Sequence, residues 1–172
     1  MLTTINEIFV SEGIDSKIIQ IGGKALNGCM ACYKCYDNKD KKCSVDDDFN
    51  NYFADMIDSD VIIIGSPTYV ADITPQAKAL IDRACIVNRA NNGILKRKIG
   101  AAVIPVRRAG SVHAFDSINH FFLISEMIIP GSIYWNMSIA RNIGEYQNDE
   151  EGVRTMKKLA ENIVWVLKKI KL

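Results

Sequence analysis

The 172-residue sequence predicts an α/β fold built on a doubly wound parallel sheet. Two runs, VIIIG at 61–65 and AAVIPV at 101–106, are continuously apolar apart from glycine and proline, as strands covered on both faces are. Segments with apolar residues at helical spacing lie between and after these runs. Strands that alternate with helices in this way are typical of a parallel sheet with helices on both sides.

The N-terminal part is expected to contain two helices and a strand. Thr3 and Thr4 can cap a short helix that ends at Gly13. Residues 17–21 (KIIQI) then form a short strand, which Gly22 and Gly23 terminate. A second helix follows one of the three aspartates at 46–48, and its apolar face consists of Phe49, Tyr52, Phe53 and Met56.

The later elements follow from capping signals and apolar spacing. Thr74 is expected to cap a helix with Pro75 at its first position, and Ser111 opens another helix. A fourth strand is predicted around 127–134, broken by Pro130 and Gly131. The last helix is the clearest, with an apolar face made by Val153, Met156, Leu159, Ala160, Ile163, Val164 and Leu167.

Composition excludes several classes of protein. Hydrophobic residues make up 48% and charged residues 24%, which predicts a globular chain and a single domain over 1–172. A net charge of +1 without a long basic run argues against a nucleic-acid partner. No apolar stretch approaches the roughly 20 residues that span a bilayer, and the N-terminus does not resemble a signal peptide. We therefore expect a cytoplasmic protein without a membrane partner.

Four of the five cysteines lie in the segment 28–45, which has no apolar periodicity and is expected to be a loop. These are Cys29, Cys32, Cys35 and Cys43. Two residues separate each of the first three from the next, and seven residues separate the third from the fourth. Cytoplasmic thiols stay reduced, so the pattern suggests metal or redox chemistry before disulfides. A four-iron cluster, zinc, and free or redox-active thiols all remain open.

Ligands of doubly wound sheets bind at the carboxyl ends of the strands, so the loops after the two central strands are candidate sites. The first contains Ser66, Pro67, Thr68, Tyr69 and Val70. Its amides and hydroxyls can bond the pyrimidine edge and ribityl chain of a flavin, with the tyrosine beside the ring. A proline turn with a half-buried tyrosine is the alternative.

The second loop contains Arg107, Arg108, Ala109, Gly110 and Ser111. The glycine permits close backbone approach, and the serine marks a helix N-terminus, which suits an electron-rich or anionic group. The arginines could meet a phosphate or a nicotinamide dinucleotide. Ordinary surface charge is the alternative.

Taken together, four segments resemble the flavodoxin-like NAD(P)H-dependent FMN reductases, and among them the iron–sulfur flavoproteins. The segments are GCMACYKC with Cys43 before DDD, then SDVIIIGSPTYVADITPQAKALIDR, AAVIPVRRAGSVHAFDSINHFF and YWNM. The resemblance implies FMN at the strand ends, with 66–70 on the ribityl and ring and 107–111 over the other side. It also implies a [4Fe-4S] cluster on the four cysteines, and a homodimer or homotetramer whose neighbouring subunit helps to close the flavin pocket.

One departure concerns the first strand and phosphate loop of this family, which precede its first helix, whereas this sequence starts inside that helix. The strand at 17–21 then corresponds to the family's second strand, and the cysteine loop at 28–45 follows it. The family's first strand would lie between 17–21 and 61–65. If the protein truly starts at this point, the phosphate loop is missing and FMN binding is expected to be weak or lost. We expect a sequence that is part of a longer product. Direct pairing of the neighbouring strands and a strand donated by another chain are the alternatives.

The sequence thus predicts an FMN-dependent oxidoreductase that takes electrons from NAD(P)H and delivers them, through a cluster, to a small-molecule or protein acceptor. Hydride transfer between the cofactors requires no acid–base side chain, so no catalytic residue is assigned. The alternatives are a non-enzymatic electron carrier or redox sensor, and a relative that no longer binds flavin.

Overall fold

The computed structural model describes residues 1–170 and contains six α-helices, one 3-10 helix and three strands within that range. The helices are α1 (Leu2–Ser11), α2 (Lys34–Asn38), α3 (Phe49–Asp58), α4 (Pro75–Ala90), α5 (Ser111–Ile124) and α6 (Glu150–Ile170), with η1 at Glu145–Asn148. The strands are β1 (Val61–Gly65), β2 (Ile99–Val106) and β3 (Met137–Ile139). Among residues 1–170, no helix is long and apolar enough to cross a membrane.

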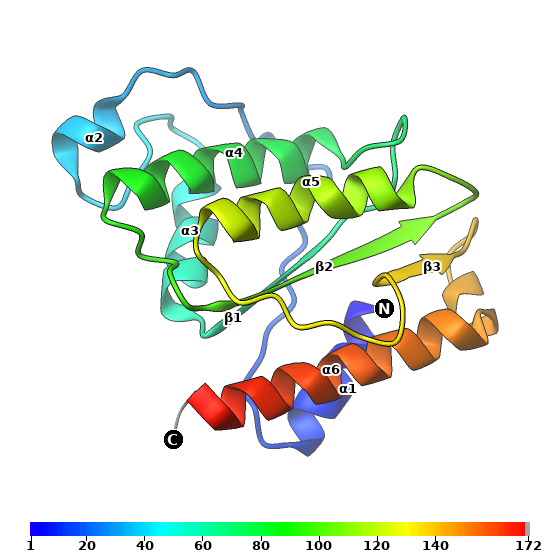
Figure 1. Ribbon diagram of the computed structural model, residues 1–172. Coiled ribbons are helices and arrows are strands. Elements are labelled where there is room, and N and C mark those ends of the chain that lie inside the picture. The colour runs from blue at the N-terminus through cyan, green and yellow to red at the C-terminus, as the bar shows by residue number, and fades with distance from the viewer. Residues whose placement is uncertain (171–172) are drawn as a thin grey trace.

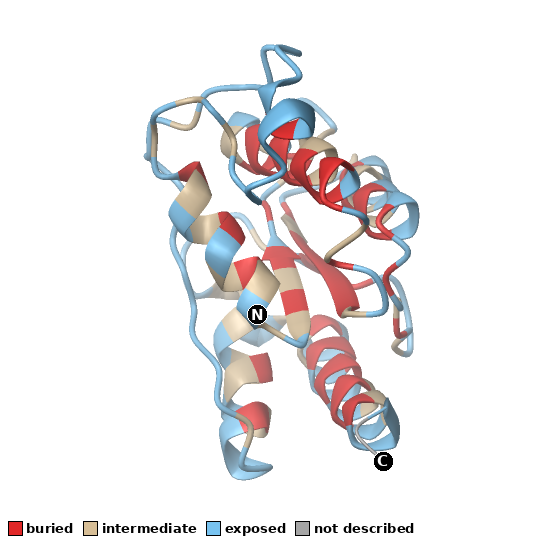
Figure 2. Ribbon diagram, turned by 90° about the vertical axis from the view of Figure 1, so that its left-hand side faces the viewer, coloured by how far each residue is buried: buried red, intermediate tan, exposed pale blue. Residues whose placement is uncertain are grey.

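The three strands form a parallel sheet in the order β1-β2-β3. Helices α3, α4 and α5 cover one face, and α1 and α6 cover the other (Figure 1). This is the doubly wound α/β arrangement predicted from the alternating pattern. Figure 2 shows that the buried positions gather on the inner sides of these layers.

Each strand contributes to two separate cores, because successive side chains point to opposite faces. On β1, Ile62 and Ile64 face the core of α3, α4 and α5, while Val61 and Ile63 face α1 and α6. Strand β2 divides in the same way and is buried at seven of its eight positions. It is the central strand, as its continuous apolar sequence indicated.

The predicted strand at 17–21 is not formed. This segment is extended but joins no ladder, and Ile18 and Ile19 remain 53% and 39% exposed. Strand β1 pairs with β2, and among the described residues no strand pairs with its other edge. A short isolated segment cannot be a stable strand without a bonded neighbour, so an apolar alternating sequence alone was insufficient here. Direct pairing of 17–21 with β1 is also not observed.

The predicted fourth strand lies further along the chain than expected. Within 127–134, a single bridge links Ile128 to Ile99, and the ladder with β2 forms only at β3. Pro130 and Gly131 interrupt the approach, and Ser132 then bonds the side chain of Asn136 instead of a strand. The chain therefore rejoins the sheet at Met137, after the end of the range predicted from its apolar residues.

Three of the four helix starts agree with the sequence, those of α3, α4 and α5, and that of α1 does not. Thr74 accepts a hydrogen bond from the Ala77 amide at 3.3 Å, and Pro75 begins α4. Ser111 begins α5 after Gly110. Helix α1 begins at Leu2, before the threonines that were expected to cap it.

The fourth start, that of α3, is stabilised by an aspartate that precedes the N-cap. Asp48 is the N-cap but makes no side-chain capping bond, whereas Asp47 accepts from the Phe49 amide at 3.1 Å. The short helix α2 was not predicted.

Close packing between α5 and β2 depends on a glycine. A Cβ at Gly100 would lie 2.6 Å from the Phe122 ring, which is itself fully buried. We expect Gly100→Ala to reduce the free energy of unfolding by about 1–3 kcal/mol, because the ring cannot move without displacing the core. Urea unfolding followed by circular dichroism measures this. Gly131→Ala is the control, since nothing lies within 4 Å of its Cβ position, and an equal loss in both variants would contradict the packing argument.

Candidate functional site

The loop after β1 reverses direction in a tight, strained turn. Tyr69 and Asp72 exchange backbone hydrogen bonds of 2.7 and 3.0 Å, and the two residues between them, Val70 and Ala71, have φ values of 49° and 63°. Left-handed backbone is costly for a β-branched residue, and such strain is concentrated at functional sites. The side chain of Val70 is fully exposed and that of Tyr69 is 58% exposed.

Ser66 supports this loop from below. Its buried hydroxyl accepts from the Thr74 amide at 2.9 Å and donates to the Pro67 carbonyl at 3.0 Å. The hydroxyl therefore joins the two ends of the loop, 66 and 74, and is already bonded within the protein. Pro67 is exposed at the start of the loop.

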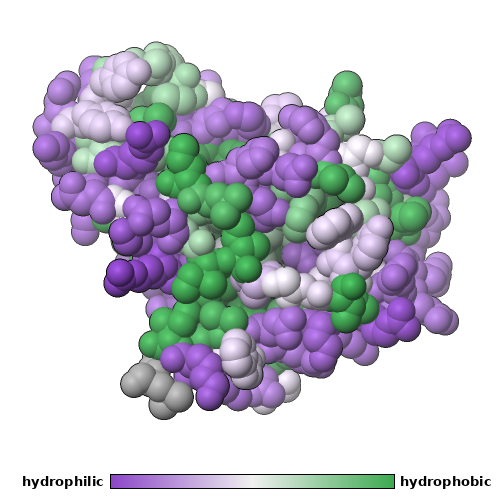
Figure 3. Space-filling model, in the orientation of Figure 1, coloured by the Kyte–Doolittle hydropathy of each residue, from purple (hydrophilic) through white to green (hydrophobic). Residues whose placement is uncertain are grey.

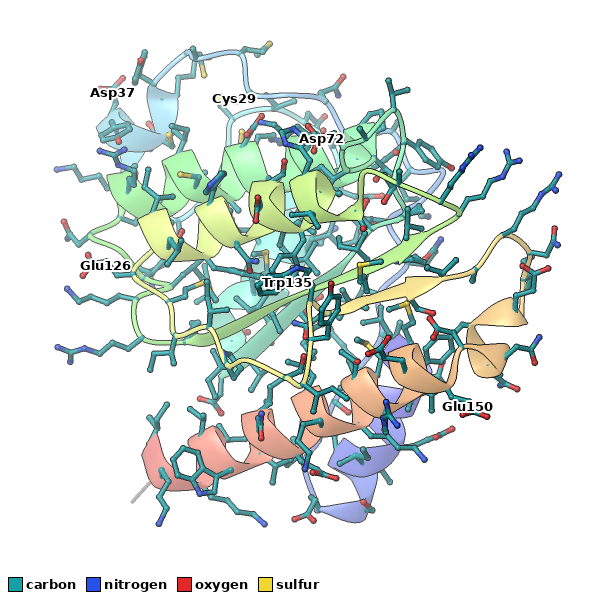
Figure 4. All side chains as sticks on the ribbon, turned by 45° about the vertical axis from the view of Figure 1, so that its right-hand side comes forward. Cys29, Asp37, Asp72, Glu126, Trp135 and Glu150 are labelled. Carbon is teal, nitrogen blue, oxygen red and sulfur yellow. The ribbon has the colours of Figure 1, made fainter. Side chains whose placement is uncertain are left out.

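The two loops predicted as a flavin site lie in contact with each other. Gly110, at φ 90°, approaches so closely that a Cβ there would be 2.7 Å from the Cα of Ala71 and 3.2 Å from a methyl carbon of Thr68. Asp72, labelled in Figure 4, accepts from the Ser117 hydroxyl of α5 at 2.7 Å. The Ser117 bond is the main cause of the lowered pKa of Asp72. Both contacts fix the first loop against the start of α5.

One polar atom between these loops has no partner. The hydroxyl oxygen of Thr68 is buried and makes no hydrogen bond among the described residues. A buried hydroxyl without a partner costs about 1–3 kcal/mol, so this position suits a ligand group that bonds it. Next to it, Ser111 is buried and contacts the sulfur of Met137 at 3.2 Å.

Arginines surround the same edge of the sheet. Arg107 and Arg108 follow β2 and are exposed, as is Ala109. Strand β3 is in register with the end of β2, and the Ala140 amide bonds the Val106 carbonyl at 2.9 Å, so Arg141 emerges beside them. None of the three arginines forms a salt bridge within residues 1–170. Guanidinium groups beside two strand ends suit an anionic ligand.

The cysteine loop has an unusual backbone. Four residues other than glycine adopt left-handed φ between the first and last cysteine of the group: Ala31, Tyr33, Lys39 and Lys41. The first two lie on either side of Cys32. Each costs of order 1–2 kcal/mol, which indicates that the surrounding contacts hold the loop in this shape.

All four cysteines line one cavity of about 60 Å³, together with Arg83, Ile86 and Val87 of α4. Cys35 is buried and Cys43 partly buried, whereas Cys29 and Cys32 are exposed. Burial raises the pKa of Cys35, and the nearby Cys43 and Cys32 raise it further. A bond with Ser44 lowers the pKa of Cys32. Within residues 1–170, no three such side chains stand close enough to bind one metal ion in this conformation.

A buried ion pair closes the base of the cysteine loop. Arg83 donates from Nη1 to both carboxylate oxygens of Asp47 at 2.8 and 2.7 Å, and the two side chains are 0% and 6% exposed. The same guanidinium bonds the carbonyls of Asn27 and Val45 at 3.1 and 3.3 Å. Asn27 donates its amide to Asp47 at 3.0 Å. The residues on both sides of the loop are therefore tied to one point on α4.

The electrostatics of this pair follow from these bonds. Burial alone would raise the pKa of Asp47, but hydrogen bonds from Arg83, Asn27 and Phe49 outweigh it and hold the pKa at about 2. Burial lowers the pKa of Arg83, while Asp47 and Cys43 together produce a net increase. The Arg83 carbon Cζ also lies 4.2 Å from the centre of the Phe49 ring. Both groups remain charged at neutral pH.

Cys43 is the most firmly held cysteine. Its amide donates to the side chain of Asn50 at 2.8 Å, and its carbonyl accepts from the same side chain at 2.9 Å. Helix α3 therefore fixes its backbone, while α4 supplies Arg83 next to its side chain. Cys29, by contrast, lies on the outer loop (Figure 4).

The two candidate sites lie along one helix, not at one point. The 66–74 loop leads into the first residue of α4, whereas Arg83, Ile86 and Val87 lie about 12–18 Å further along its axis. The cysteine loop thus covers the later turns of α4, with α2 packed against it (Figure 1). The cysteine loop and the loops at the strand ends are therefore separated by the length of this helix.

Comparison with known proteins agrees with this architecture. Residues 1–142 match the family described as NADPH-dependent FMN reductase. The chain belongs to this family. An iron–sulfur flavoprotein of Methanocaldococcus jannaschii is 32% identical over 167 residues, covering 93% of this chain and 84% of that protein. An iron–sulfur flavoprotein of Methanosarcina thermophila is 30% identical over 172 residues, covering 95% of this chain and 84% of that protein.

Solved structures confirm the flavodoxin-like fold of this FMN reductase family member. RosB, solved with a bound 8-demethyl-8-formylriboflavin-5′-phosphate intermediate, superposes with a TM-score of 0.76 at 10% identity, covering 99% of this chain and 71% of that one. A WrbA-like flavodoxin from Agrobacterium tumefaciens gives a TM-score of 0.57 at 14% identity, covering 69% of this chain and 73% of that one. At these identities the likeness concerns the fold alone.

Sequence reasoning missed Arg83, Asn50 and Arg141 as site residues of this reductase family member. Arg83 carried a signal: it stands on the face of α4 that also presents Leu80, Ala84 and Val87 to the core. A charged residue at such a position requires a buried counterion. Asn50 and Arg141 carried none, because their roles depend on how separate segments meet.

Proposed function

We propose that this protein is an FMN-dependent oxidoreductase that transfers electrons from NAD(P)H to an acceptor, with a [4Fe-4S] cluster as its second redox centre. The observation that carries the flavin assignment is the contact of the two loops at Gly110, beside the unpartnered hydroxyl of Thr68. Family membership supports the same assignment. Bound FMN supplies the ability to accept a hydride and release electrons singly.

The residues of the two loops have distinct tasks in this proposal. Thr68 donates or accepts a hydrogen bond at the flavin, and Pro67 and the turn at 69–72 shape the loop around it. Tyr69 packs against the ring system, while Ser66 holds the loop ends and makes no contact of its own. Arg107 and Arg108, with Arg141 beside them, bind phosphate groups of the dinucleotide. Ala109, Gly110 and Ser111 bring backbone amides close to the ring.

Cys29, Cys32, Cys35 and Cys43 hold the cluster in this proposal. Their fit rests on donor chemistry: four thiols line one cavity, and soft thiolate ligands in this number suit iron and sulfide. The exposed pair, Cys29 and Cys32, closes toward Cys35 and Cys43. Two of the similar proteins are named iron–sulfur flavoproteins, which supports the same ligand set.

We further propose that the protein works as a homodimer or homotetramer. Figure 3 shows hydrophobic side chains in a band that runs from the end of α5 to the end of α6. Exposed apolar residues of these segments are Leu123, Ile124, Ile128 and Ile170. A contiguous apolar surface is typical of an interface between subunits. Light scattering coupled to gel filtration tests this, and a monomer at micromolar concentration would contradict it.

An anaerobic preparation with iron, sulfide and FMN assays on one sample tests the cofactor assignment. We expect about four irons and one FMN per chain. FMN without iron would remove the cluster from the proposal and leave the flavin part. Neither cofactor would contradict both parts.

Reduction by NADPH or NADH separates an enzyme from an electron carrier. We expect either nicotinamide to bleach the flavin absorbance within seconds under anaerobic conditions. Bleaching only by a protein donor such as ferredoxin would instead support a non-enzymatic carrier with the same cofactors.

A further inference from the structure

A guanidinium group that lines the cysteine cavity has one nitrogen without a hydrogen-bond partner among the described residues. Arg83 is fully buried, and Nη1 and Nη2 bond Asp47 and two backbone carbonyls. Its Nε is buried as well but has no hydrogen-bond partner among the described residues. A buried N–H of a charged group that lacks a partner is costly, so a ligand that brings an acceptor to this position would remove that cost.

The location of that donor is specific. Arg83 lines the same cavity as the four cysteines, and Cys43 is near enough to its guanidinium to contribute to the raised pKa of that group. Phe49 covers the guanidinium plane at 4.2 Å, so the side chain cannot swing out to water. The carboxylate of Asp47 holds Nη1 in place, and the carbonyl of Val45 holds Nη2. The charge next to Cys43 is therefore fixed and poorly screened by solvent.

We propose that Arg83 is a positioning residue that tunes the reduction potential of the iron–sulfur cluster, by donating its Nε–H to a sulfur on the Cys43 side of the cluster. The inference rests on the proposed function, since it assumes the cluster. Taking up one electron adds a negative charge to a site that four thiolates already make negative. A buried cation and a hydrogen bond to sulfur stabilise that added charge, so they raise the potential.

Arg83 also anchors the cysteine loop, in addition to its proposed bond to the cluster. The Arg83–Asp47 pair ties 27 and 45–47 to α4, which fixes the ends of the cysteine loop. Asn50 fixes Cys43 itself from α3. The donor and the ligand are thus held on two helices of the rigid core, while Cys29 and Cys32 lie on the exposed part of the loop.

Arg83→Lys is the decisive variant, because a lysine keeps the charge and the pair with Asp47 but has no Nε–H branch. After anaerobic treatment of the full chain with ferrous iron and sulfide, we expect this variant to bind as much iron as the wild type. We expect the equilibrium constant for one-electron reduction of its cluster to be tenfold lower. That corresponds to a potential about 59 mV more negative in a dithionite titration followed by electron paramagnetic resonance. Arg89→Lys is the matched control, since Arg89 is exposed on the same helix.

A second comparison removes the charge. Arg83→Met in an Asp47→Asn background leaves no buried ion without a partner, and we expect its potential to lie below that of Asp47→Asn alone. If Arg83→Lys bound its full complement of iron and had the same reduction potential as the Arg89→Lys control, the inference would be overturned. A wild-type chain that takes up no iron would overturn the cluster proposal and this inference together, whereas its FMN content would still test the flavin assignment separately.

Discussion

Asp47→Asn is expected to lower the free energy of unfolding by about 3–5 kcal/mol at pH 7, because it leaves Arg83 buried without a counterion. The asparagine retains one oxygen, which can still accept from one of the two amides, so the loss reports on the charge together with one backbone hydrogen bond. Urea unfolding measured by circular dichroism gives the difference. We expect the cysteine loop to become more accessible to protease at the same time, since its base is no longer held.

The same pair makes stability depend on pH in the acid range. The pKa of Asp47 is about 2 in the folded protein and about 3.9 in an unfolded chain. A lowered pKa contributes stability above the unfolded value, and this contribution is lost as the pH falls toward 2. The shift corresponds to about 2–3 kcal/mol. We expect the wild type to lose this amount between pH 5 and pH 2, and Asp47→Asn to lack this component.

Asp82→Asn is the control for both measurements. Asp82 neighbours Arg83 in sequence and pairs with Lys78, but both of these side chains are about half exposed. An exposed ion pair contributes at most about 1 kcal/mol. If Asp82→Asn destabilised the protein as much as Asp47→Asn, the stability could not be attributed to the buried pair of Arg83 and Asp47.

Gly110→Ala is expected to weaken FMN binding by tenfold or more. An alanine Cβ would collide with Ala71 at 2.7 Å and press on Thr68, so the two loops must separate where the flavin is proposed to bind. The residue also has a φ of 90°, which alanine adopts at a cost of order 1 kcal/mol. Flavin fluorescence quenching on titration with FMN measures the dissociation constant.

Gly144→Ala isolates the steric part of this effect. Gly144 has nearly the same φ, 89°, but nothing lies within 4 Å of its Cβ position. It should show the backbone strain without the loop displacement, and FMN binding should stay close to the wild-type value. Equal weakening in both variants would contradict a role for the contact between the two loops. A wild-type chain without measurable FMN binding would contradict the flavin proposal itself.

The sequence predicted those elements in which local signals and tertiary packing agree. The runs at 61–65 and 101–106 became strands because their residues suit burial on both faces, and Thr74 with Pro75 started α4 because capping is local. The segment at 17–21 has a strand-like sequence but no bonded neighbour, and pairing is not encoded in the segment itself. The start of β3 was misplaced for the same reason, since register with β2 decides it.

The candidate site was predictable in composition but not in arrangement. The two loops after the strands were found because parallel strands bring their carboxyl ends to one edge. The cysteines were found from spacing, yet nothing in that spacing indicates that they cover the later turns of α4. Arg83 and Asp47 are separated by 36 residues, and only the folded chain brings them together.

The outer edge of β1 has a consequence for how this chain behaves in solution. Ser66 and Asp60 bond β2, so the amides and carbonyls of the alternate residues, Val61, Ile63 and Gly65, point the other way. Within residues 1–170 no strand pairs with this edge, and an unpaired β-branched edge is a template on which extended segments of other molecules can add. Asp58 and Asp60, whose carboxylates lie near Lys98, precede the strand, and charged residues that flank an apolar strand oppose such growth. We therefore expect the solubility of this chain to fall as the salt concentration rises, because salt screens those charges.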